Sequence, residues 1–104
     1  MVPGLLSSTT EAQWVRILEA WGRCAYCGAE GPALQKDCVL PISRGGSYTI
    51  DNVVPACRSC NASKCNDEVT SWMRRRRLDE PQFLRRWVEV TYAMREAEGT
   101  RVSR

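Results

Sequence analysis

Two Cys-x-x-Cys pairs constrain the fold of this 104-residue chain more than any other feature of its sequence. They place four thiols at Cys24, Cys27, Cys57 and Cys60. Two thiolates on one tight turn converge on a single ion, and four thiolates form the closed tetrahedral set of structural zinc. Such a site has no open position for a substrate, so Zn²⁺ here is expected to stabilise the fold and to stay outside any catalysis. Four free cysteines, or two disulfides, are the alternatives.

The small size of the chain favours such a metal. One hydrophobic core of this size gives limited stability, and small domains often add disulfides or a metal. A secreted disulfide framework is the weaker interpretation, because the N-terminal MVPGLLSSTT has no charged region followed by a long apolar run. No apolar run approaches the ~20 residues of a transmembrane helix. We therefore expect a soluble cytoplasmic protein with reduced thiols and no membrane partner.

The net charge and the absence of histidine limit the ligands and catalytic groups that this chain can use. The net charge of +3 is compatible with nucleic-acid binding, and residues 74–77 are four consecutive arginines. This run is either the solvated end of a helix or a set of phosphate contacts, which would give salt-dependent affinity that is indifferent to sequence. The chain contains no histidine, so the commonest general base and a common zinc ligand are both absent.

The hydrophobic pattern predicts helices on both sides of the cysteine-bounded segment. Thr10 starts a capping-box pattern before a short amphipathic helix that ends at Gly22. Asn66 or Asp67 can cap a second helix, which ends in the arginine run, and Asp79 can cap a last one. The expected apolar stripe of that last helix consists of Phe83, Leu84, Trp87, Val88, Thr91 and Met94.

Between the cysteine pairs the order strand, loop, strand, helix is expected. The first strand lies within 34–42, and the sequence SRGGS forms a loop whose glycines allow a tight turn. The second strand is expected at 48–54, where Pro55 would end it, and a helix then runs from the second cysteine pair through Lys64.

We expect a single domain over residues 9–98. Its core would be 23–65, followed by C-terminal helices within 66–98. Residues 1–8 are expected to form a flexible arm and residues 99–104 a flexible tail, because neither shows hydrophobic periodicity.

The stretch LQKDCVLPISRGGSYTIDNVVPACRSCNASK resembles the HNH endonuclease family of the zinc-bracketed kind. That family's pattern runs Asp-His, a Pro and a Gly-Gly loop, Asp/Glu-Asn-apolar-apolar-Pro, and Cys-x-x-Cys-Asn-x-x-Lys. The matching positions are Asp37, Pro41, Gly45-Gly46, 51–55 and 57–64. The resemblance implies a small α+β fold, in which a ββα-metal (His-Me finger) core with a four-cysteine zinc site is flanked by α-helices.

The resemblance also implies an activity and roles for individual residues. The activity is hydrolysis of DNA phosphodiester bonds with one Mg²⁺ or Mn²⁺ as cofactor. No element of the sequence is suited to reading base edges, so weak sequence specificity is expected. Asp37 and Asn61 would hold this cation, because hard oxygen ligands suit it. Asn52 would orient the general base and tether the loop. Arg44 and Lys64 are expected to contact phosphate by their position, and Arg74 and Arg76 as members of the arginine run.

Two cysteines depart from the family pattern. Cys38 stands where the family has its general-base histidine. A thiol, with a pKa of about 8.5, is mostly protonated at neutral pH unless nearby cations lower that pKa. We therefore expect impaired cleavage, whether Cys38 is natural or engineered. Cys65 replaces a common glycine; it is a small residue at a helix end, a disulfide partner of Cys38, or part of a second zinc site.

Two other functions stay open at this point. One is a DNA-binding module that has kept the fold and lost catalysis. The other is a zinc-stabilised accessory protein, whose partners would be a phage terminase or other components of a nuclease complex.

Overall fold

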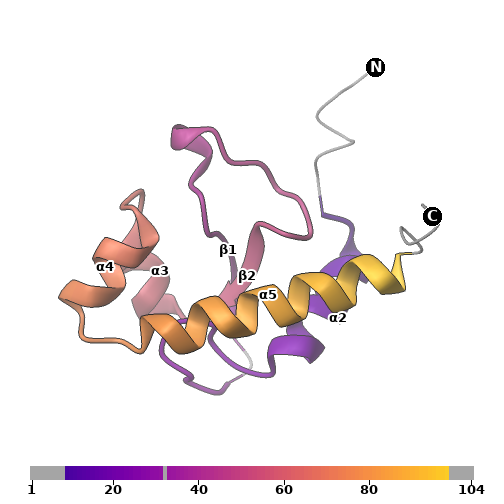
Figure 1. Cartoon of the computed structure of the whole chain (residues 1–104), viewed down its shortest axis with the longest axis horizontal. Coiled ribbons are helices and arrows are strands. Elements are labelled where there is room, and N and C mark those ends of the chain that lie inside the picture. The colour runs from indigo at the N-terminus through magenta and orange to yellow at the C-terminus, as the bar shows by residue number, and fades with distance from the viewer. Residues whose placement is uncertain (1–8, 32, 99–104) are drawn as a thin grey trace.

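The computed structural model describes residues 9–31 and 33–98, so the predicted arm and tail lie outside the described residues. Figure 1 shows the elements in chain order: α2 (Glu11–Trp21), β1 (Gln35–Cys38), the 3₁₀ helix η1 (Ile42–Arg44), β2 (Val53–Ala56), α3 (Arg58–Lys64), α4 (Val69–Arg75) and α5 (Glu80–Ala97). The two strands form an antiparallel sheet. The predicted small α+β class, with a ββα core and flanking helices, is confirmed.

The first helix begins and ends where the sequence predicts. The Thr10 hydroxyl accepts a hydrogen bond from the Gln13 amide at 3.1 Å, and the Gln13 side chain accepts one from the Thr10 amide at 2.9 Å. Gly22 ends α2 with a φ of 74°, in the left-handed region that glycine tolerates best. The helix buries Trp14, Ile17 and Trp21.

The predicted bounds of the second strand were wrong. Residues 48–52 lie outside any strand, with a turn at 50–52, and β2 begins only at Val53. It also contains Pro55, which pairs with Lys36 of β1. Because each strand of a two-stranded sheet has an unpaired edge, a proline there removes no ladder hydrogen bond. The Pro55 carbonyl instead accepts a hydrogen bond from the Ala25 amide at 2.8 Å, which ties the first cysteine turn to β2.

Two features of the C-terminal helices differ from the prediction: the N-cap of α4 and the exposure of Val88 in α5. Glu68, not Asn66 or Asp67, caps α4, and hydrogen bonds from the Ser71 and Thr70 amides lower the pKa of its carboxyl to about 2. Asp79 caps α5 as predicted. Val88 of α5 is 66% exposed, whereas Val90 is buried. The buried face is a narrow stripe at Phe83, Trp87, Val90 and Met94.

An aromatic cluster joins the helices to the first cysteine turn. Tyr26 lies between Trp72 of α4 and Phe83 of α5, with ring centroids 5.2 and 5.1 Å away. Figure 1 shows α5 running along the molecule, with the loop between β1 and β2 projecting away from it. None of the helices within the described ranges is both long and apolar enough to cross a membrane.

Candidate functional site

The four paired cysteines form one cluster. Their Sγ atoms all lie within 4.8 Å of one another, and the Cys27 and Cys57 sulfurs are 3.7 Å apart. A tetrahedral Zn²⁺ with Zn–S bonds of about 2.3 Å requires sulfurs about 3.8 Å apart. The cluster is therefore positioned to hold a metal, and four sulfur donors suit zinc.

Backbone geometry explains why the cluster forms. The Cys27 amide donates to the Cys24 sulfur at 3.5 Å, and the Cys60 amide donates to the Cys57 sulfur at 3.4 Å. Gly28 closes the first turn with a φ of 81°, and the Cys57 side chain caps α3. Each pair thus orients its own thiols, and β2 brings the two pairs together.

A second group of predicted residues surrounds a cavity of about 410 Å³. Its walls come from β1, η1, the loop after η1 and the end of α3. The lining residues are Lys36, Asp37, Cys38, Pro41, Ile42, Tyr48, Asn61, Cys65 and Asn66. The structure therefore brings Asp37 and Cys38 of β1 and Asn61 of α3 to one cavity.

Asp37 is held by one of its two carboxylate oxygens. The Tyr26 hydroxyl donates to Oδ2 at 2.6 Å, and the Lys64 ammonium lies 3.2 Å from the same oxygen. Oδ1 has no hydrogen-bond partner among the described residues. Burial, followed by the charge of Asp37, raises the pKa of Tyr26 well above its usual value, so this phenol stays protonated and donates. Asp37 is 9% exposed and lines the cavity.

Lys64 has no exposed surface, which differs from its predicted contact with phosphate. Its ammonium also donates to the Cys38 carbonyl at 2.9 Å. Sequence reasoning missed Tyr26 altogether. Its position between the two cysteines of a zinc turn was the available signal, but only the tertiary packing brings its hydroxyl to Asp37.

Asn61 and Asn52 play different structural parts. Asn61 donates through Nδ2 to the Gln35 side chain at 2.7 Å, so its Oδ1 is the atom left for a cation at the cavity. Asn52 is not part of the cavity lining; its side chain joins Leu40 to Ser47 across the β1–β2 loop. Its Oδ1 accepts from the Leu40 amide at 2.8 Å, and its Nδ2 donates to the Leu40 and Ser47 carbonyls at 3.0 and 2.9 Å.

Cys38 is buried beside Asp37, with its sulfur 4.0 Å from the Ser47 carbonyl. Burial, and then the negative charge of Asp37, raise the pKa of the Cys38 thiol, while Lys64 opposes them. The thiol is therefore protonated at neutral pH. Cys65 lies at the end of α3 with a φ of 49°, a conformation that favours glycine.

The predicted arginine contacts differ in their partners. The Arg44 Nε donates to the Asn66 carbonyl at 2.8 Å, which fixes Arg44 beside the cavity. Arg74 makes two hydrogen bonds with Glu80, at 3.0 and 3.3 Å. Arg76 is exposed, and no described side chain pairs with it.

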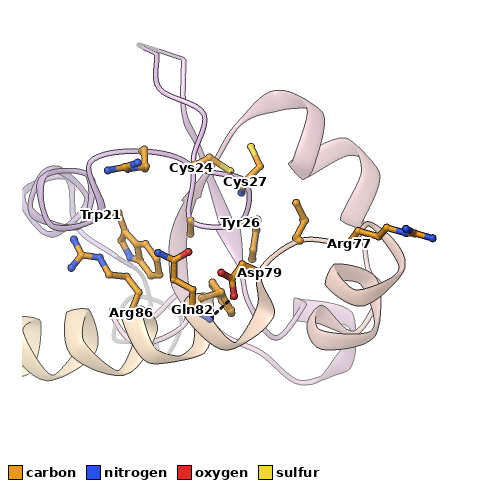
Figure 2. Close-up of a pocket in the computed structure, with 13 residues that line it drawn as sticks. Trp21, Cys24, Tyr26, Cys27, Arg77, Asp79, Gln82 and Arg86 are labelled. Atoms are coloured by element: carbon orange, nitrogen blue, oxygen red, sulfur yellow. Dashed lines mark hydrogen bonds between the residues drawn. The ribbon is translucent and has the colours of Figure 1, made fainter.

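A larger cavity, of about 660 Å³, lies between the first cysteine turn and the start of α5. Figure 2 shows Trp21, Gln82 and Arg86 gathered at one end of it and Arg77 pointing away. Its one carboxylate, Asp79, already accepts a hydrogen bond from the Gln82 amide. None of the predicted residues Asp37, Cys38 and Asn61 lines this cavity, and we place the candidate site in the smaller one, which all three line.

Comparisons with known proteins agree with this arrangement. Residues 24–68 match the family model described as HNH endonuclease. Over 74 residues the chain is 30% identical to YoqL of Bacillus subtilis (strain 168), a candidate HNH endonuclease derived from the SPbeta prophage. That alignment covers 61% of this chain and 32% of the relative, so the chain spans about a third of the relative's length. No solved structure matches the chain.

The matched segment contains both the four-cysteine cluster and the residues that line the smaller cavity, from β1 to the end of α3. Sequence match, strand order and the geometry of the four cysteines therefore agree: residues 24–68 of this chain match the HNH endonuclease family.

Proposed function

We propose that this chain hydrolyses phosphodiester bonds in DNA with one Mg²⁺ or Mn²⁺, and that Cys38 makes it slow. The observation that carries the proposal is that Asp37 and Asn61 line one cavity and that each keeps an oxygen, Oδ1, without a hydrogen-bond partner among the described residues. Hard oxygen donors of this kind suit both cations. When bound, the cation would stabilise the negative charge that develops on the scissile phosphate.

Tyr26 and Lys64 would act as positioning residues. Both engage Oδ2 of Asp37, and neither is exposed enough to touch DNA. They fix the carboxylate so that Oδ1 faces the cavity in one orientation. Because Lys64 is fully buried, we assign it this role in place of the predicted phosphate contact.

Cys38 accounts for the low activity that we propose. General-base catalysis contributes about 10²- to 10⁴-fold to a rate when the base has a pKa near the operating pH. Imidazole meets this condition, whereas a thiol with a pKa of about 8.5 or higher does not. No histidine elsewhere in the chain can replace it. Asn52 would still hold the loop in the shape that orients a base at position 38.

DNA would be held mainly through its phosphates. Arg44 beside the cavity, with Arg74 and Arg76 farther along the chain, would supply affinity that falls with salt and depends little on sequence. Substrate and enzyme would meet in the cytoplasm of a bacterial or phage-infected cell.

The absence of any histidine favours a second candidate function. The chain would then bind DNA without cutting it, as a zinc-stabilised module. Both candidates require DNA binding, and only the first requires a cation at Asp37 and Asn61.

Nicking of supercoiled plasmid with Mg²⁺ or Mn²⁺ separates the two candidates. Under the first, Cys38→His cuts about 10²- to 10⁴-fold faster than the parent chain. Cys65→His places a histidine at the same cavity away from the base position, and it should give no gain. Adding Asn61→Ala to the Cys38→His variant should remove the cutting.

If neither the parent nor Cys38→His cuts while both shift plasmid in a gel, the second candidate is correct. If neither protein binds DNA at all, both candidates are wrong.

A further inference from the structure

The β1–β2 loop holds apolar side chains outward at the mouth of the candidate site. Leu40, Ile42 and Tyr48 are 46%, 48% and 48% exposed. Ile42 and Tyr48 line the same cavity as Asp37 and Asn61. Apolar side chains gain no stability by facing solvent, so their grouping at the rim of a polar cavity suggests a ligand that covers them.

The exposure of these side chains is fixed by the backbone of the loop. Asn52 joins Leu40 to Ser47 by three hydrogen bonds, and the Thr9 hydroxyl donates to the Tyr48 carbonyl at 3.0 Å. A Cβ at Gly46 would lie 1.8 Å from the Leu40 carbonyl oxygen, so the two sides of the loop approach as closely as glycine allows. Tyr48 therefore lies on a loop whose backbone is held in place by hydrogen bonds.

A cation completes this rim. Arg44 follows Ile42 by two residues, and its Nε–H is engaged by the Asn66 carbonyl, which also anchors the guanidinium. No carboxylate in the described residues forms an ion pair with Arg44. An aromatic face and an aliphatic side chain thus line the cavity, and a cation is anchored to Asn66 of the same lining. This combination matches the base and the phosphate of a nucleotide.

The size of the patch argues against a protein partner. A stable protein interface buries about 800 Å² on each side through some 20–30 residues. Three side chains are far fewer, but one aromatic ring is enough to stack on one base.

We propose that Tyr48, supported by Ile42, stacks on a nucleobase that is unstacked beside the scissile phosphate. The site would then take single-stranded or locally opened DNA in preference to closed duplex. This rests on the proposed function, because it places DNA at the cavity. Base–aromatic stacking contributes about 1–3 kcal/mol for each base, measured by alanine substitution.

The test is fluorescence polarisation of the zinc-loaded chain with labelled oligonucleotides: single-stranded, fully paired, and paired with one bulged nucleotide. We expect the parent to bind the single-stranded and bulged DNA more tightly than the duplex. Tyr48→Ala should weaken binding of the first two by about 5- to 150-fold, and Tyr48→Phe should bind like the parent. Tyr92→Ala removes a tyrosine that is 67% exposed on α5, away from the cavity, and should change nothing.

Replacing the bulged nucleotide with an abasic one should also remove most of the Tyr48→Ala effect, because no base is left to stack. Equal binding of all three DNAs by the parent, or equal losses in Tyr48→Ala and Tyr92→Ala, would overturn the stacking proposal and leave the proposed function intact. Failure of the parent to bind any DNA would overturn both.

Discussion

The four paired cysteines form a metal-binding cluster, whereas the other two, Cys38 and Cys65, do not. The four paired cysteines converge within 4.8 Å, and each thiol is placed by its own turn or helix start. Cys38 and Cys65 line one cavity, yet with Asp37 they form no three-ligand group within the described ranges. The first group is positioned to hold a metal, whereas the second forms no such group, and Cys65 has a backbone conformation that favours glycine.

Residues 24–68 thus contain two sites that suit different metals, one with sulfur ligands and one with oxygen ligands. The sulfur cluster is closed and soft, which suits zinc as a structural ion. The cavity keeps two free oxygens, which suits a hard cation that must also contact a substrate. Tyr26 connects them, because it lies between two zinc-site cysteines and donates to Asp37.

The largest effect is expected from removing zinc. Stripping the metal with a chelator under reducing conditions, or making Cys57→Ser, should unfold the chain, because zinc binding in such sites is folding free energy. Circular dichroism and metal analysis on the same sample measure this. Cys65→Ser is the matched control and should keep both its zinc and its spectrum. An unchanged spectrum in a metal-free sample would show that the cluster is dispensable.

Lys64→Met should have the next largest effect. It leaves the buried Asp37 carboxylate without its cation, and breaking a buried pair in this way costs about 3–5 kcal/mol. Urea denaturation of the zinc-loaded protein measures the loss. Lys36→Met changes the neighbouring exposed position of β1 and should cost far less. Equal losses in the two variants would mean that Asp37 does not depend on Lys64.

Tyr26→Phe should have a moderate effect. It keeps the aromatic packing and removes one hydrogen bond to a charged group, which costs about 1.5–3 kcal/mol. Zinc content should not change, while affinity for Mn²⁺ should fall because Asp37 loses part of its orientation. Tyr92→Phe controls for the loss of an exposed hydroxyl. A drop in zinc content with unchanged Mn²⁺ affinity would contradict the bridging role.

Cys65→Gly should have the smallest effect, and it should stabilise the protein. Cys65 has a φ of 49° and a ψ of −121°, and a non-glycine residue there costs on the order of 1 kcal/mol. Thermal denaturation of Cys65→Gly and Cys65→Ser separates backbone strain from loss of the thiol. A gain in both variants, or in neither, would mean that strain at Cys65 is not the cause.

Sequence reasoning succeeded where the determinants are local. The capping box at Thr10, the zinc turns and the order of strand, helix and loop all depend on neighbouring residues. It failed where contacts between distant parts of the chain determine the position or burial of a residue. Pro55 lies inside β2 because the outer edge of that strand needs no amide, and Lys64 is buried because Asp37 and the Cys38 carbonyl receive its ammonium.

Tyr48 shows the same limit for the candidate site. The pattern of residues 48–54 predicts a strand, in which Tyr48 would be an ordinary sheet residue. In the structure Tyr48 lies in a loop that Asn52 holds by hydrogen bonds, and it lines the cavity. The sequence pattern alone does not predict this position.

The separation of the two metal sites is most directly tested by counting both metals on one sample. Metal analysis gives the zinc content, and Mn²⁺ titration followed by electron paramagnetic resonance gives the second site. We predict one zinc and one Mn²⁺ per chain, with Asn61→Ala weakening Mn²⁺ binding at least about tenfold at unchanged zinc content. Asn66→Ala, at the same cavity, should keep both metals. Loss of zinc in Asn61→Ala, or Mn²⁺ binding that ignores the substitution, would contradict the account.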